Sequence, residues 1–142
     1  MWRLVLAAAC LVVADAKEEA NRADIAKWQG EWRAVAMESN GKPSTDEQLA
    51  KIKLTVNGTN YHFQNGSFSE HGTYRFNAAV EPKQLDIVVG DGKDKGKIYQ
   101  TIYKIAGEEL TICLESANEE RPTDFTGRAG SGCVLEVWRR GR

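Results

Sequence analysis

Residues 52–66 read IKLTVNGTNYHFQNG, and this stretch decides the fold. Apolar and polar side chains alternate over residues 52–56, and the Asn-Gly dipeptide that follows is the one most typical of a tight hairpin turn. The return segment places Tyr61 and Phe63 on one face and ends in a second Asn-Gly dipeptide. Alternation with a period of two, interrupted by such turns, predicts antiparallel β-hairpins with one buried face.

The same alternation continues on both sides of this stretch. Six further strands are expected at residues 31–37, 67–76, 85–89, 97–105, 110–115 and 133–140, with a bulge at Gly72. A short helix is expected over residues 46–51, because Ser44 and Thr45 each have Glu or Gln three residues later. Eight antiparallel strands in meander order can close into an up-and-down barrel, which removes their unpaired edges. We therefore expect an all-β, eight-stranded antiparallel barrel, with a two-sheet sandwich as the alternative.

Residues 1–16 are predicted to form a signal peptide. Arg3 gives a basic start, residues 4–13 are apolar, and residues 14–16 read Ala-Asp-Ala, which fits the small-x-small cleavage pattern. The apolar run is too short for a membrane-spanning helix, which needs about 20 residues. Lipoprotein processing at Cys10 and a buried N-terminal helix are the alternatives. The expected division of the chain is 1–16 signal peptide, 17–27 a poorly anchored helical lead-in, and 28–142 the barrel domain.

The composition limits the partners of the chain. The formal net charge of the 142 residues is −1, so there is no basic excess for binding nucleic acid or an anionic membrane. No later segment is apolar enough to span a bilayer. We therefore expect an exported protein, periplasmic or secreted, with no nucleic-acid partner and no membrane span.

The two cysteines that follow the signal peptide are expected on opposite faces of the barrel wall. Cys113 alternates with Ile112 and Leu114, so its side chain should point outward. In the last strand Cys133 lies on the same face as Leu135, and because this face is the more apolar one it should point inward. Such a pair cannot be bridged without backbone movement, and a disulfide is the alternative.

The wider pattern of motifs resembles a known family. The motifs are Gly30-x-Trp32, Asn40-Gly41-Lys42-Pro43, Pro82-x-x-x-Asp86, Ile102-Tyr103-x-x-x-Gly107, Leu110-x-x-Cys113-Leu114, Arg121-Pro122-x-x-Phe125 and Arg140. Their order resembles the small lipocalin-like domain found in many copies in planctomycete bacteria, although Glu108-Glu109 stands where that family more often has Asp-Thr. The resemblance implies that Trp32 closes one end of the barrel, that Gly30 precedes it in the signature, and that Arg140 lies across the indole ring. It implies export and no particular chemistry.

The barrel interior is the candidate binding site. The turn around Gly107 pairs Ile105 with Leu110 and therefore brings Tyr103 opposite Ile112, on the inner face. The side chains that we expect to line the interior are Tyr61, Phe63, Tyr74, Phe76, Tyr99 and Tyr103. Buried tyrosine hydroxyls need hydrogen-bond partners, so this lining suits a pocket with a few polar groups. An eight-stranded barrel is just wide enough to fill itself or to hold one small ligand, and both alternatives remain.

The long loop before the last strand carries the second candidate. Here we expect Arg121 and Asp124 to face each other while Phe125 tucks under the barrel. The functional alternative places Arg121 at the barrel mouth, where it would bind an anionic group. His62 and His71 are expected on the solvated surface.

Three functions follow from this interpretation. The first is binding of a small, largely apolar molecule in the barrel. The alternative is a structural or protein-interaction module with a filled core and no ligand. An enzyme is the least favoured, because no nucleophile with a neighbouring base is visible. The sequence indicates no cofactor and no metal site, and it identifies no protein partner.

Overall fold

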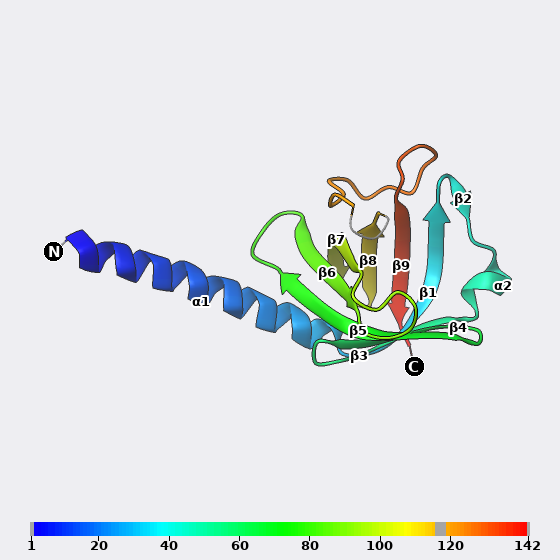
Figure 1. Cartoon of the computed structure of the whole chain (residues 1–142), viewed down its shortest axis with the longest axis horizontal. Coiled ribbons are helices and arrows are strands. Elements are labelled where there is room, and N and C mark those ends of the chain that lie inside the picture. The colour runs from blue at the N-terminus through cyan, green and yellow to red at the C-terminus, as the bar shows by residue number, and fades with distance from the viewer. Residues whose placement is uncertain (1, 116–118, 142) are drawn as a thin grey trace.

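The computed structural model describes residues 2–115 and 119–141, with side chains from residue 14 onward. A long helix leads into an all-β body (Figure 1). The elements are α1 (Trp2–Trp28), β1 (Gly30–Ser39), β2 (Lys42–Pro43), α2 (Asp46–Leu49), β3 (Ile52–Asn57), β4 (Asn60–Asn65), β5 (Phe68–Asn77), β6 (Lys83–Val89), β7 (Ile98–Ala106), β8 (Glu109–Leu114) and β9 (Val134–Arg140).

The strands form a closed antiparallel barrel of lipocalin-like type. Neighbours in sequence pair from β3 through to β9, and β1 pairs with both β3 and β9, which closes the ring. The two-residue β2 only pairs with the end of β1 and lies outside the eight-stranded ring. The predicted barrel is therefore confirmed, and the sandwich alternative is wrong. The short helix also forms, with Thr45 and Gln48 making the expected capping box.

The hairpin registers follow the turn chemistry. Ile105 lies opposite Leu110 and Tyr103 opposite Ile112, as the turn around Gly107 predicts. Leu54 lies opposite Phe63 across the first Asn-Gly turn. These registers direct Tyr61 and Phe63 of β4 and Tyr103 of β7 into the interior.

The predicted bulge is wrong. Gly72 pairs regularly with Tyr61 on one side and Val89 on the other, and the register shift lies instead in β1, opposite β9. A Cβ atom at Gly72 would lie 2.5 Å from Cε1 of Tyr61 and would overlap the Val88 carbonyl oxygen. Glycine is needed here because the Tyr61 ring lies against the backbone.

The last turn of α1 is anchored to the barrel, contrary to our expectation of a poorly anchored lead-in. Trp28 is fully buried, and Asp24, one helical turn earlier, is 3% exposed. The Asp24 carboxylate accepts hydrogen bonds from Nζ of Lys83 at 2.8 Å and from the hydroxyl of Tyr103 at 2.7 Å. Two side chains four residues apart on one helix face therefore enter the barrel. Among the described residues, no helix is long and apolar enough to cross a membrane.

The faces of β9 are the reverse of those predicted. Leu135 points outward and packs with Cys133, Cys113 and Ile102 beneath Phe125 of the preceding loop. The alternate residues of β9, among them Glu136, therefore point inward. The hydrophobic parity misleads here because the segment before β9 covers the outer wall, which makes both faces of the strand apolar. Cys113 and Cys133 consequently lie on the same side, and both thiols are free.

Candidate functional site

One end of the barrel is closed by Trp32. Its ring is fully buried, and its Nε1 donates a hydrogen bond to the Trp28 carbonyl oxygen at 2.8 Å. The Arg140 guanidinium lies 4.3 Å from the centre of the Trp32 ring and donates to the carbonyl oxygens of Gln29 and Lys27. Gly30 adopts φ +105°, a conformation that side chains rarely tolerate, where the helix turns into β1. The stacked guanidinium thus ties the last strand to the end of the helix.

A packed aromatic cluster fills the half of the barrel next to this closure. The Trp28 ring meets the rings of Tyr74, Phe76 and Tyr103 edge to face, with centroids 5.2–5.3 Å apart. The Tyr103 hydroxyl donates its hydrogen bond to the Asp24 carboxylate. Phe76 and Tyr103, which we expected to line a pocket, therefore belong to the solid core.

The other half of the barrel contains a cavity of about 230 Å³. Its lining residues are Leu54, Tyr61, Phe63, Glu70, Tyr74, Ile87, Tyr99, Ile112, Leu114, Glu136 and Trp138. Four of the side chains proposed from the sequence are thus brought together here, namely Tyr61, Phe63, Tyr74 and Tyr99. The stacked rings of Tyr61 and Tyr74, with centroids 4.7 Å apart, form part of the wall.

Two carboxyl groups face this cavity. Glu136 comes from β9, and its carboxylate oxygen accepts a hydrogen bond from Nε1 of Trp138 at 3.3 Å. Burial raises the pKa of Glu136 to about 7, and the bond from Trp138 offsets this only in part. Glu70 comes from β5 and accepts a hydrogen bond from the Tyr61 hydroxyl at 2.8 Å. The cavity therefore combines aromatic walls with a pair of hydrogen-bond acceptors.

The tyrosine hydroxyls remain protonated donors at any physiological pH. Burial raises the pKa of Tyr61 well above its usual value, and the nearby Glu70 carboxylate adds to this. Burial likewise raises the pKa of Tyr74 and that of Tyr99, which is less deeply buried. No lysine, arginine or histidine is among the described residues that line the cavity. Its fixed charge is therefore negative or zero.

Arg121 does not face this cavity. It lies against the outer wall, where Nη2 is 2.6 Å from a carboxylate oxygen of Asp86 and Nη1 donates to the Thr101 carbonyl oxygen at 2.7 Å. The expected pairing with Asp124 is therefore wrong, and so is a position at the barrel mouth. Phe125 packs outside the barrel, with Nζ of Lys104 4.7 Å from its ring centre.

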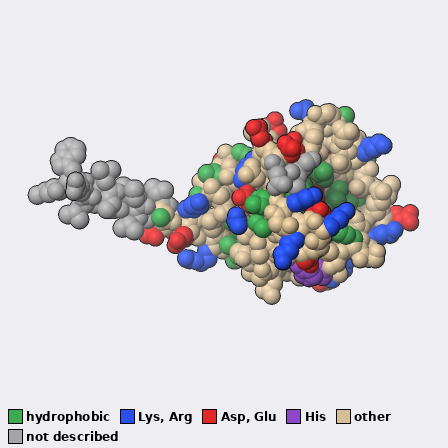
Figure 2. All heavy atoms as spheres, viewed as in Figure 1, with side chains coloured by type: hydrophobic (Ala, Val, Ile, Leu, Met, Phe, Trp, Pro, Cys, Tyr) green, Lys and Arg blue, Asp and Glu red, His purple; other side chains and the backbone are tan. Residues whose placement is uncertain are grey.

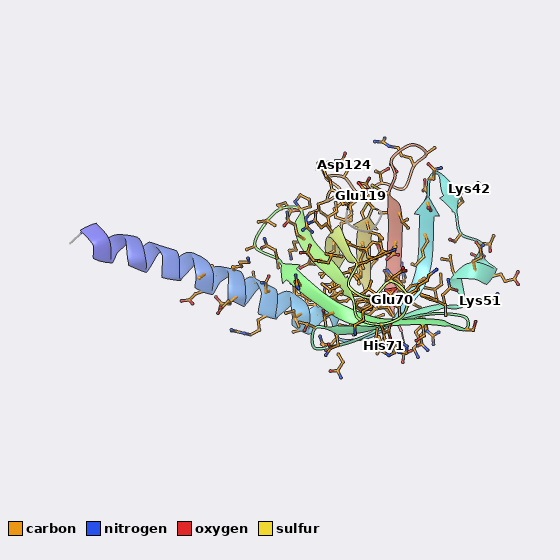
Figure 3. All side chains as sticks on the ribbon, in the orientation of Figure 1. Lys42, Lys51, Glu70, His71, Glu119 and Asp124 are labelled. Carbon is orange, nitrogen blue, oxygen red and sulfur yellow. The ribbon has the colours of Figure 1, made fainter. Side chains whose placement is uncertain are left out.

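Two of the most informative residues were missed by sequence reasoning. Glu136 lies on the face of β9 that we expected to point outward, and Glu70 was not among the residues that we expected to line the interior. Figure 3 shows Glu70 and His71 on opposite sides of β5, with Glu70 toward the barrel interior. Strict alternation along β5 from Tyr74 would have placed Glu70 inside.

The two histidines lie outside the barrel. Their rings stack with centroids 4.0 Å apart, and Nδ1 of His71 is 2.8 Å from a carboxylate oxygen of Asp91. Among the described residues, no group of three or more potential ligands could hold a metal ion. Figure 2 shows charged side chains of both signs scattered over the visible face of the barrel. The cavity is therefore the best candidate for a functional site.

Comparisons of the chain with protein-family models, with curated proteins and with solved structures find no match. The function proposed below consequently depends on the geometry and chemistry of the cavity.

Proposed function

We propose that this chain is an exported lipocalin-like protein that binds one small, largely apolar molecule inside its barrel. The observation that carries the proposal is the cavity of about 230 Å³ bounded by aromatic and aliphatic side chains. Small-molecule sites are typically concave and apolar, with a few polar groups that orient the ligand. Here the hydroxyl of Tyr61 and the carboxyl groups of Glu70 and Glu136 supply those polar groups.

The cavity volume limits the size of the ligand. An engineered protein cavity of about 150 Å³ accommodates benzene, whereas drug-sized ligands occupy roughly 300–1,000 Å³. A volume of about 230 Å³ therefore suits one six-membered ring with a short substituent. Haem and other large ligands of barrels exceed this volume.

The N-terminal segment supports the proposed location. A basic residue, an apolar run and Ala14-Asp15-Ala16 together have the pattern of a cleaved export signal. The resemblance to the small planctomycete lipocalin-like domains points the same way. We propose a periplasmic or secreted protein, with lipid anchoring at Cys10 as the less favoured alternative.

A neutral probe tests ligand binding. We expect 2-phenylethanol to bind one site per chain in isothermal titration calorimetry, because the ring fits the apolar cavity and its hydroxyl can reach a carboxyl group. Leu114→Trp adds a large side chain to the cavity wall and should abolish binding. Val35→Trp adds the same ring at an exposed position and should leave binding unchanged.

Native mass spectrometry of the protein purified without denaturation complements this titration, because a retained small molecule would appear as a mass increment. Absence of binding to the folded wild-type chain, with circular dichroism confirming the β-structure, would contradict the proposal. Unchanged binding in Leu114→Trp would place the ligand outside the cavity. Either result would favour a structural or protein-interaction role.

A further inference from the structure

We propose that the cavity selects a ligand with a positively charged amine, of the class of single-ring arylalkyl ammonium ions, and that Glu136 is its counter-ion. This inference rests on the proposed function and specifies its ligand. It arises from three features of the same site, which are the sign of its charged groups, the spare acceptor capacity of Glu136 and the aromatic walls.

The charged groups of the cavity are all of one sign. Glu70 enters from β5 and Glu136 from β9, and the described lining contains no basic side chain to neutralise either. A carboxylate ligand would meet like charges in a partly desolvated space, which costs free energy. An ammonium ion would instead provide the missing positive charge.

The two carboxyl groups differ in how fully they are satisfied. Glu70 already accepts a short hydrogen bond from the Tyr61 hydroxyl at 2.8 Å. Among the described residues, the one donor to the Glu136 carboxyl group is Nε1 of Trp138, at a long 3.3 Å. A carboxylate can accept about four hydrogen bonds, so most of the acceptor capacity of Glu136 remains for a ligand. The three N–H groups of an ammonium ion can donate hydrogen bonds to these unused acceptor positions.

The walls around the carboxyl groups also favour a cation. The rings of Tyr61 and Tyr74 stack 4.7 Å apart, and Phe63, Tyr99 and Trp138 complete the aromatic lining. A cation within about 6 Å of such ring faces is attracted by their quadrupoles, more strongly where water is excluded. The same rings provide flat apolar surface for the ring of the ligand.

Protonation of Glu136 makes the selectivity depend on pH. The titratable groups that share its cavity are Glu70, Tyr61, Tyr74 and Tyr99, while β8 and β1 present the apolar Ile112 and Met37 opposite it. Burial keeps the pKa of Glu136 near 7, so the group is ionised at pH 8 and largely neutral at pH 5.5. Affinity for the ammonium ion should therefore rise with pH across this range. An alkylamine stays protonated throughout, as a lysine side chain does.

Three ligands of similar shape and different charge test the inference by calorimetry. The ligands are 2-phenylethylamine, 2-phenylethanol and 3-phenylpropionate. At pH 8 we expect the amine to bind about tenfold more tightly than the alcohol, because a charge-assisted hydrogen bond replaces a neutral one. The carboxylate should bind most weakly. At pH 5.5 the advantage of the amine over the alcohol should shrink severalfold.

Two variants locate the effect. Glu136→Gln should bring the affinities for the amine and the alcohol close together at pH 8, and the variant should still bind the alcohol. Glu109→Gln removes an exposed carboxylate from the outer face and should leave the preference for the amine unchanged.

Each outcome distinguishes the inference from the proposed function. Equal affinity of the wild-type protein for amine and alcohol at pH 8 would overturn the inference and leave the proposed function standing. An undiminished preference in Glu136→Gln would overturn the assignment of Glu136 as counter-ion. If none of the three ligands binds, both the proposed function and the inference fail.

Discussion

Replacing Glu136 with glutamine should make the protein more stable at pH 8 and change how its stability depends on pH. Burial raises the pKa of this carboxyl group from 4.5 to about 7 in the folded state. Between these two values the folded protein binds more protons than the unfolded chain. The free energy of unfolding therefore falls as the pH rises through this window, because the folded protein must ionise a group that the barrel wall desolvates.

The magnitude follows from the size of the shift. A change in pKa from 4.5 to about 7 corresponds to about 3 kcal/mol, since one pKa unit is about 1.4 kcal/mol. Glu136 is partly exposed to the cavity, so the measured loss should be somewhat smaller, about 2 kcal/mol. Glutamine keeps the shape and the acceptor oxygen for Trp138 but cannot ionise.

Urea unfolding at pH 5, 6, 7 and 8 measures this effect. The wild-type protein should lose about 2 kcal/mol relative to Glu136→Gln between pH 5 and pH 8, with equal m-values for both proteins. Glu109→Gln is the matched control, because the Glu109 carboxylate is exposed and its ion-pair partner, Nη2 of Arg139 at 3.6 Å, is exposed as well. Its difference from wild type should not vary with pH by more than a few tenths of a kcal/mol. Parallel pH profiles for wild type and Glu136→Gln would refute the reasoning.

Three further predictions concern other parts of the molecule. Trp32→Ala should lower the free energy of unfolding in urea by about 3–5 kcal/mol, because it empties the closed end of the barrel; a nearly neutral effect would contradict that placement. Asp24→Asn should cost about 1–3 kcal/mol in the same assay, because Lys83 loses its charged partner, and no loss would mean that the helix end is not anchored by this pair. Burial raises the pKa of the Cys113 thiol to about 11, so iodoacetamide at pH 8 should alkylate it slowly until urea unfolds the chain; rapid labelling of the native protein would contradict its burial.

Most of the barrel follows from local signals. The Asn-Gly turns and the alternating strands fix both the register and the face of Tyr61 and Phe63. The turn around Gly107 likewise fixes the pairing of Tyr103 with Ile112. Such hairpins are predictable because the turn and the alternation of side chains specify the same arrangement.

The last strand was not predictable in the same way. The loop before β9 packs Phe125 over Cys113 and Leu135, so apolar side chains lie on both faces of this part of the wall. The pattern of apolar residues then assigns the wrong face to β9, and with it to Glu136, the carboxyl group of the cavity whose pKa burial raises. How much of the barrel interior is filled could not be predicted either, because Trp28 enters the barrel from a helix and not from a strand.

Arg121 shows the limit of reasoning from sequence neighbours. A loop can pair a charged side chain with any strand beneath it, and here the partner is Asp86, thirty-five residues away. Distance along the chain favoured Asp124 but did not decide the contact.

The most direct test of the central claim is the response of the tryptophan indole N–H signals to 2-phenylethanol in a ¹⁵N–¹H spectrum. Nε1 of Trp138 lies beside Glu136 in the cavity, whereas Nε1 of Trp32 is held by the Trp28 carbonyl oxygen in the packed half. We expect the Trp138 signal, assigned with Trp138→Phe, to shift in a saturable way while the Trp32 signal stays in place. A Trp138 signal that does not move, or one that moves no more than that of Trp32, would contradict a ligand in this cavity.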